Sequence, residues 1–489
     1  MGTTRASARR TPVRGESRHA QTGLAPFKRG DLPPLPGSFW ELVGPGAVLV
    51  GLSIGAGELI IWPRITAQYG ASMVWAALLG VFVQLWLNLE IGRYTLATGE
   101  SPYSGFARLS PAFAWVFLAL NVVGWIVPGW ARACGGTLKA LIVGPDGWGS
   151  PAVWTAITFA AVAGVLFGPR RVYRSVERTT EALVVIVTLG LVAIALSVST
   201  ADTWLGLAHG AINIGFKDPR MPGYELFASI VFAGAGGTAN LFYCFYIRDK
   251  GWGMGAHMPV VVNPLRQREE RAVDTGFRIN ETPTNVSRWR QWQRHLTHDQ
   301  MLFFWLLNSV TIVLFILGAL AVLFPRGIVP DRELLVWDEA AILGASWGEP
   351  GRILFLLVGV ACLFSTQLTL VDGVARSCAD ILHANFRWAR QRHLSTWYAW
   401  IAAGWIVAGV ALTYLYESLP AILFLLSAGF FGGLAMALYA PLTLVINLRY
   451  LPPAMRPSHV RIAVMLAVSL FYGIFAVVSL FQLGQRLLL

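Results

Sequence analysis

The chain has 489 residues, of which 55% are hydrophobic and 13% are charged. The charged fraction is about half that of an average soluble domain, and apolar runs of roughly 20 residues, each long enough to cross a bilayer, recur along the chain. This composition excludes an ordinary soluble protein and predicts an all-α membrane protein, whose net charge of +12 belongs to loops and tails rather than to a nucleic-acid-binding surface.

Residues 1–40 are rich in Arg, Ser and Thr and contain no apolar core. They predict a disordered basic cytoplasmic tail rather than a signal peptide. The remainder, 41–489, is then a single polytopic domain. Its four Cys residues form no CxxC pair and its eight His residues no HExxH motif. Neither a disulfide framework nor a zinc centre is expected, and no cofactor is expected either.

About eleven apolar segments follow the tail in chain order. They are expected at roughly 43–67, 72–98, 112–135, 152–168, 180–200, 225–247, 300–324, 353–383, 396–416, 419–448 and 461–485.

The distribution of basic residues predicts the orientation of these segments. Most of the 38 Lys and Arg residues fall in the tail and in every second connection, and such connections are normally cytoplasmic. The connection between segments seven and eight lies on the opposite side and is acidic, with Asp331, Glu333, Asp338, Glu339 and Glu349. We therefore expect a plasma (inner) membrane protein with its N-terminus in the cytoplasm and its C-terminus outside.

Segments one and six share an unusual motif for a spanning helix. Segment one contains "SIGAGELI", with Gly55 and Gly57, and segment six contains "FAGAGGTAN", with Gly234 and Gly236. The two copies lie five segments apart, and an odd number of crossings per half reverses the orientation of the second half. This spacing predicts a LeuT-like 5+5 inverted repeat, with repeats at about 41–200 and 225–448, an extra last helix at about 461–485, and broken helices one and six.

Glycine lets a helix unwind because it has no Cβ atom and tolerates positive φ. Unwound backbone groups cannot be left bare in hydrocarbon, so they must line a polar cavity or meet a ligand. Glycine for close helix packing is the alternative interpretation, but two matched copies favour the breaks. The predicted substrate-binding residues are Ser53, Gly55, Ala56, Gly57, Glu58, Gly236, Gly237, Thr238 and Asn240.

Charged residues inside the segments are further candidates. An intramembrane acid such as Glu58 costs roughly 2.5–3.5 kcal/mol to insert, which makes it the candidate metal ligand. Asp372, Arg376 and Asp380 recur every four residues and share one helical face. They predict a salt-bridge ladder at the inner gate, with a coupling-ion or proton path as the alternative. Arg132 is a further gating or coupling candidate.

The run Gly44–Trp75 resembles the first helix of the Nramp divalent-metal transporters. The matching residues are Gly44-Pro45-Gly46, Gly57, Gln68, Gly70 and Trp75, followed by Ala97-Thr98-Gly99, Asn240-Leu241 and the residues around Asn308. The likeness extends through roughly the first seven segments. It implies an eleven-helix LeuT-like fold and secondary transport.

The resemblance fails at the residues that carry the family's metal chemistry. Gly55-Ala56-Gly57-Glu58 stands where the family has Asp-Pro-Gly-Asn, and Gly237-Thr238-Ala239 stands where it has Met-Pro-His. Gly129 and Arg132 replace the acids of the family's proton path. Without the soft thioether ligand, a hard Mg²⁺-like ion that keeps several waters fits better than Mn²⁺ or Fe²⁺.

These observations predict a secondary transporter of Nramp-related type that moves a metal cation, its bound substrate, by alternating access. The alternative is a transporter of a small organic solute, such as an amino acid or a carboxylate, because the "IGAGE" stretch also resembles the first helix of amino-acid transporters of the same broad fold. Arg132 would then attract an anion, or would pair with Glu58. No nucleotide loop or hydrolase motif is present, so no enzyme is expected. The lipid bilayer is the expected surrounding, and the sequence leaves the oligomeric state open.

Overall fold

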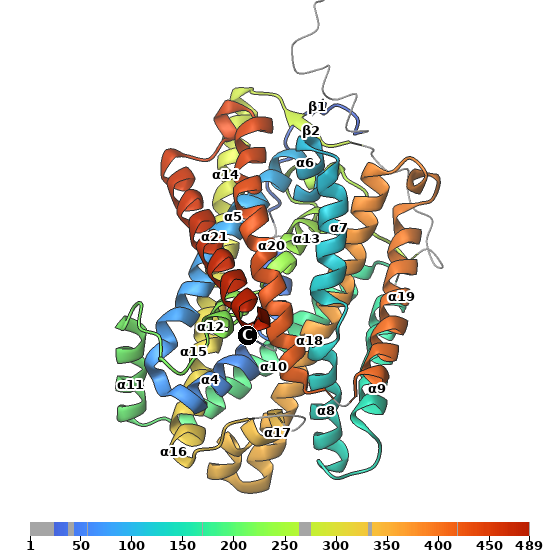
Figure 1. Ribbon diagram of the computed structural model, residues 1–489. Helices are drawn as coiled ribbons and strands as arrows, with labels where there is room; N and C mark the ends of the chain where they lie inside the picture. Colours follow the sequence, from blue (N-terminus) through green and yellow to red (C-terminus); the bar gives the residue numbers. More distant parts are fainter. Residues whose placement is uncertain are drawn as a thin grey trace, which may run out of the picture.

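The computed structural model describes residues 24–37, 44–55, 57–168, 170–263, 275–330, 335–417 and 419–488. Long helices run between two ends of the molecule (Figure 1). Eight helical stretches of the described residues are long and apolar enough to cross a membrane, and one of them, Pro45–Thr98, contains both of the first two predicted segments. The fold is therefore the expected all-α membrane fold.

The first half of the chain contains the first five predicted segments. Its elements are β1 (Lys28–Gly30), α3 (Pro45–Ser53), η1 (Gly57–Ile61), α4 (Trp62–Tyr69), η2 (Gly70–Met73), α5 (Val74–Thr98), α6 (Pro102–Leu109), α7 (Ala112–Trp125), α8 (Gly129–Val143), α9 (Pro151–Phe167), α10 (Val172–Val198) and α11 (Ala201–Ile212).

The second half contains the other six. Its elements are α12 (Gly223–Val231), η3 (Gly237–Phe242), α13 (Tyr243–Lys250), η4 (Gly253–His257), β2 (Phe277–Ile279), α14 (Pro283–Asp299), η5 (Gln300–Leu307), α15 (Asn308–Gly318), η6 (Ala319–Leu323), α16 (Phe324–Arg326), α17 (Leu335–Glu339), α18 (Ala341–Asn385), η8 (Ala389–Gln391), α19 (Leu394–Leu415), α20 (Ala421–Tyr450), η9 (Pro453–Met455) and α21 (His459–Leu488).

Segment three is not one continuous helix. It consists of α7 and α8, which meet at Pro128. Proline has no backbone N–H and its ring clashes with the preceding turn, so the helix stops at Trp125 and restarts at Gly129. Its second part runs on to Val143, beyond the expected end at about 135. Segment eight lies in α18, which is kinked at Gly348 (φ 65°), so a short helix from Ala341 precedes the spanning part, and the spanning part begins close to the expected residue 353.

The part of the N-terminal segment that the structure describes, 24–37, is ordered, which corrects the prediction of a disordered tail over 1–40. Strand β1 pairs in parallel with β2, with Lys28 opposite Phe277. Helix α14 holds the residues that follow: Asn285 accepts from the Leu32 N–H at 3.1 Å, and the Trp292 indole donates to the Pro33 carbonyl at 2.9 Å. Sequence reasoning misses this pairing because the partners come from the connection between segments six and seven, some 250 residues away.

We call the end of the molecule that carries β1, β2, α6 and α14 the N-terminal face. Helices α16 and α17 lie at the opposite end (Figure 1). The basic connections predict that the N-terminal face is cytoplasmic.

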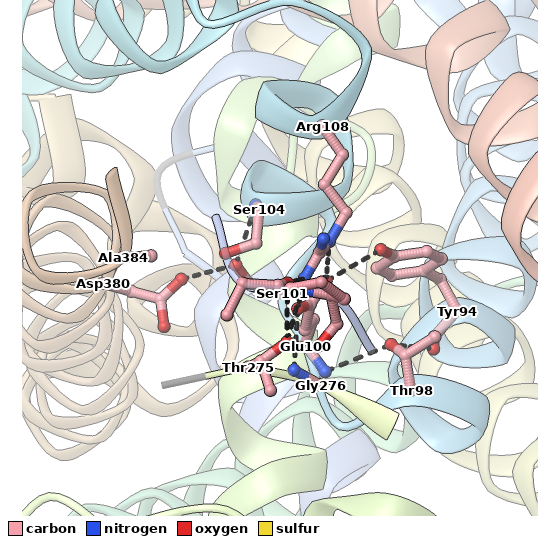
Figure 2. A network of polar contacts seen from close by, with 12 residues as sticks. Tyr94, Thr98, Glu100, Ser101, Ser104, Arg108, Thr275, Gly276, Asp380 and Ala384 are labelled. Atoms are coloured by element: carbon pink, nitrogen blue, oxygen red, sulfur yellow. Dashed lines mark hydrogen bonds and ion pairs between the residues drawn. The ribbon is translucent and has the colours of Figure 1, made fainter. Parts of the chain in front are cut away.

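A buried ion-pair network ties the N-terminal face together. Arg108 donates to Glu100 at 2.9 Å and to the Ala25 carbonyl at 2.9 Å, and the Gly276 N–H donates to Glu100 at 2.8 Å. Figure 2 shows Glu100 at the centre of these contacts, with Ser101 reaching Asp380 on the neighbouring helix. The network thus joins the N-terminal segment, α6, the connection that carries β2, and α18.

Candidate substrate site between two broken helices

The first helix breaks where the sequence predicts. Helix α3 ends at Ser53, and the chain turns at Ile54 and Gly55 before the π-helical turn η1 restarts it at Gly57. Ala56, one of the predicted site residues, lies outside the described residues. The last turn of α3 leaves carbonyl groups without intrahelical partners, as every helix end does.

Two hydroxyl side chains of α18 satisfy these carbonyls. Ser365 donates to the Gly51 carbonyl at 2.7 Å, and Thr366 donates to the Leu52 carbonyl at 3.1 Å. A Cβ atom on Gly55 would lie 1.8 Å from the Thr366 hydroxyl oxygen. Glycine is therefore needed at 55 for the close approach of α18 that completes the break.

The sixth helix breaks in the same way. Helix α12 ends at Val231, and the chain passes through Gly236 (φ 73°) and Gly237 (φ 52°) before η3 and α13 continue it. Positive φ at both positions strongly favours glycine. Both GAG motifs thus mark real interruptions of spanning helices.

Gln84 of α5 completes the second break. Its side-chain amide donates to the Val231 carbonyl at 2.8 Å and accepts from the Gly236 N–H at 3.0 Å. The same oxygen accepts from Asn240 at 3.0 Å. Sequence reasoning missed Gln84, although a glutamine within an otherwise apolar segment was the available signal, and the structure buries it completely.

Asn308 joins the two breaks directly. Its side-chain oxygen accepts from the Ser53 hydroxyl at 2.6 Å, and its amide donates to the Ala233 carbonyl at 3.0 Å. A Cβ atom on Gly57 would lie 1.9 Å from the Phe232 carbonyl oxygen. The two interrupted helices therefore touch at their break points, as a shared site requires.

A cavity lies between the breaks. Ser53 and Gly57 line it from the first break, Gly234 and Ala235 from the second, and Thr366 from α18. The rest of the wall is apolar and partly aromatic, formed by Leu52, Trp125, Trp130, Phe232, Leu370 and Leu425.

The other predicted site residues build the breaks rather than the cavity wall. Gly237 packs against Gly432 of α20, and its carbonyl accepts from the Tyr439 hydroxyl at 2.9 Å. Thr238 accepts from the Trp125 indole at 2.9 Å, and the Asn240 amide donates to Gln84. Gly236 supplies positive φ to the second break.

Glu58 lies on η1, immediately after the first break, and is completely buried. Neither carboxylate oxygen has a hydrogen-bond partner within the part of the chain that the structure describes. Thr311 of α15 and Cys362 of α18 are polar neighbours. Glu58 therefore lies among η1, α15 and α18, beside the cavity rather than in its wall.

The contacts of Arg132 differ from the expected pairing with Glu58. Its guanidinium donates to the carbonyls of Tyr416, Glu417 and Leu419 at 2.6 to 2.8 Å. It fixes the connection between α19 and α20. It makes no hydrogen bond to Glu58, whose oxygens have no such partner among the described residues.

Asp372 and Arg376 form the expected ladder. Arg376 donates to Asp372 at 2.7 Å and also pairs with Asp249 of α13. Two turns along α18 from Asp372, Asp380 pairs with Arg248 of α13 at 2.6 Å. The ladder thus links α13, the second half of the broken sixth helix, to α18 near the N-terminal face.

The contact between the breaks predicts a large effect of Gly57→Ala. The new Cβ would force the backbone at Phe232 to move, and overpacking of this kind costs about 1–3 kcal/mol. A lower thermal unfolding temperature of the detergent-solubilised protein is expected. Gly404→Ala in α19 is the matched control, because nothing lies within 4 Å of its added Cβ. Equal unfolding temperatures for the two variants would contradict the contact.

The comparisons with known proteins concern the fold. No family model matches the chain, and no curated protein gives a significant sequence match. Among solved structures, a manganese transporter from Eremococcus coleocola is similar at a TM-score of 0.66, with 16% identity over 95% of this chain and 90% of that one.

Two further structures are similar over nearly their whole length. MhsT in complex with L-phenylalanine has a TM-score of 0.55 and 14% identity, covering 92% of this chain and 99% of that one. Mhp1, a nucleobase-cation-symport-1 family transporter in a closed conformation, has a TM-score of 0.51 and 13% identity, covering 94% and 93%. The chain therefore has the LeuT-type fold of membrane transporters, with its first and sixth helices broken.

Proposed function

We propose that this protein is a secondary transporter that moves a cation by alternating access, and that Glu58 is the charged group of its site. The observation that carries the proposal is the complete burial of a carboxylate, without hydrogen-bond partners among the described residues, immediately after a helix break. The fold shared with transporters supports the class of function.

The energetics of Glu58 favour a cation. An ionised carboxylate that is buried without a partner is strongly unfavourable, so it must bind a proton or a positively charged ligand. A residue of this kind within a spanning segment marks an ion or proton pathway by default.

Among metal ions, the ligand atoms available near Glu58 favour a hard cation. No group of three or more His, Cys, Asp or Glu residues suited to a metal ion occurs in the described ranges. Glu58 has the Thr311 hydroxyl beside it, and oxygen donors suit hard, Mg²⁺-like ions. We infer a divergent relative of the Nramp transporters that lacks their usual metal motifs, a relation supported by the manganese transporter of similar fold.

Alternating access would move the broken helices with segments two and seven against a scaffold of segments three, four, eight and nine. The ladder between α13 and α18 crosses that boundary close to the N-terminal face. In this conformation the ion pairs connect the moving helices to the scaffold at the N-terminal face. Movement of a substrate to that side therefore requires these ion pairs to break.

A small organic solute is the second candidate. Trp125, Trp130 and Phe232 give the cavity an aromatic wall, and apolar lining with a few polar groups is typical of sites for small molecules. MhsT, which has a similar fold, was solved with L-phenylalanine.

Thermal-shift measurements on the purified protein separate the two candidates. Mg²⁺ is expected to raise the unfolding temperature in a concentration-dependent way, because a ligand that binds only the folded state stabilises it. Na⁺ at matched ionic strength is the control for the general effect of salt on electrostatic interactions. Stabilisation by an amino or carboxylic acid, with no response to Mg²⁺ or Mn²⁺, would contradict the metal assignment.

A further inference from the structure

A second buried acid lies near Glu58. Glu339 is the last residue of the short helix α17, in the connection between segments seven and eight. It is completely buried, and neither of its carboxylate oxygens has a hydrogen-bond partner within the described ranges. A glutamate that only fills space in a protein interior is costly where leucine would pack as well, so its presence calls for a function.

Helix α17, which carries Glu339, packs toward the first helix break. It contacts η1, α8 and α18. Val336 of α17, Leu59 of η1 and Thr137 of α8 all meet at Gly359 of α18. Helix α17 therefore packs against η1, the element that carries Glu58.

Glu339 follows Val336 by three residues, so the two side chains lie on the same side of the helical turn. Because Val336 packs beside Leu59, the residue next to Glu58, this side of α17 is turned toward the first break. Both carboxylates also lie close enough to the Cys362 thiol to act on it electrostatically. The two acids therefore belong to one region of the protein.

Among the described residues, no charged side chain forms a hydrogen bond with the Glu339 carboxylate. Arg132 of α8 lines a cavity beside α17, and its guanidinium is bound to backbone carbonyls of the connection between α19 and α20. Arg352 of α18 lies over the Trp337 ring at 4.4 Å. Burial raises the pKa of Glu339 well above its usual range, and the neighbouring negative charge of Asp338 raises it further.

We propose that Glu339 is a proton-binding station that passes protons from the outer medium to Glu58. This inference rests on the proposed role of Glu58 as the charged group of the transport site. Helix α17 lies at the end opposite the N-terminal face (Figure 1), which is the side predicted to be outside. A proton from the medium binds a Glu339 carboxylate oxygen. That O–H bond then breaks as a new one forms on Glu58 through intervening water. Glu58 releases its proton on the opposite side when the site opens there, and the medium protonates Glu339 again.

Proton entry into proteoliposomes tests the relay. The vesicles contain a pH-sensitive dye, and an inward proton gradient is imposed with the potential clamped. Glu339→Gln is expected to slow proton entry at least tenfold relative to the wild type. Glu349→Gln is the matched control, because Glu349 lies in the same part of the chain with a side chain that is 70% exposed, and its proton entry is expected to match the wild type.

The variants separate the two hypotheses. Loss of proton entry in Glu58→Gln together with wild-type entry in Glu339→Gln would overturn the relay and leave the role of Glu58 intact. Wild-type entry in both variants, or a wild-type protein that admits no protons, would overturn the relay, while the role of Glu58 in binding a cation is tested separately by Mg²⁺ uptake. Circular dichroism checks that the variants are folded. In infrared spectra, a carboxylic-acid C=O band that is absent from Glu339→Gln is expected to exchange its proton with the outer medium, whereas a carboxyl group with a purely structural role would stay protected from exchange.

Discussion

Replacing Glu58 with glutamine is expected to abolish saturable Mg²⁺ uptake into proteoliposomes. Glutamine keeps the shape of the side chain but carries no charge, so the attraction for a cation is lost. Stability is expected to be unchanged or raised, because the substitution removes a buried acid that has no hydrogen-bond partner among the described residues. Uptake is measured with a Mg²⁺-sensitive dye inside the vesicles, and stability by thermal unfolding.

Glu181→Gln is the control for this experiment, because Glu181 lies on α10 in the same half of the chain and is only partly buried. Its uptake is expected to equal that of the wild type. Uptake by Glu58→Gln within twofold of the wild type would exclude Glu58 as the charged group of the site.

Arg376→Leu is expected to have the largest effect on stability. It leaves Asp249 and Asp372 buried without their common partner, and breaking a buried ion pair on one side costs about 3–5 kcal/mol. The same change weakens the link between α13 and α18. Faster alkylation of the buried Cys244 on α13 is therefore expected, measured beside the thermal unfolding temperature.

Arg220→Leu provides the matched comparison. Arg220 pairs with Asp218, but its side chain is 71% exposed, and exposed pairs contribute only about 0–1 kcal/mol. If Arg376→Leu changed the unfolding temperature and the Cys244 alkylation rate no more than Arg220→Leu does, the ladder would not hold the N-terminal face closed.

The two helix breaks could be predicted because their cause is local. A glycine pair within an apolar segment is visible in the sequence, and its recurrence five segments later indicates the repeat. The partners that satisfy the breaks could not be predicted in the same way. Gln84 is a single polar residue in an apolar helix, and Ser365 and Thr366 begin the polar run Ser-Thr-Gln-Leu-Thr of segment eight. The sequence shows the cost of burying these side chains but not the distant backbone groups that offset it.

Two other features depend on contacts between distant parts of the chain. The sequence places Glu339 in an acidic outer connection because its neighbours in sequence are acidic, whereas α17 folds inward and buries it. The ordering of residues 24–37 likewise depends on β2 and α14. Charge patterns predict which side of the membrane a connection occupies, but they do not predict whether that connection packs onto the helices.

The N-terminal segment has a consequence for the energy balance of the proposed transport cycle. Two halves related by an inverted repeat would, taken alone, give two opposite-facing states of nearly equal free energy. The segment 24–37 precedes the first repeat and has no counterpart in the second, and it binds β2, α14 and α6 at the N-terminal face. Under the proposed alternating access, these contacts would bias the population toward the state that is closed at the N-terminal face, and a transported ligand would supply the free energy that opens it.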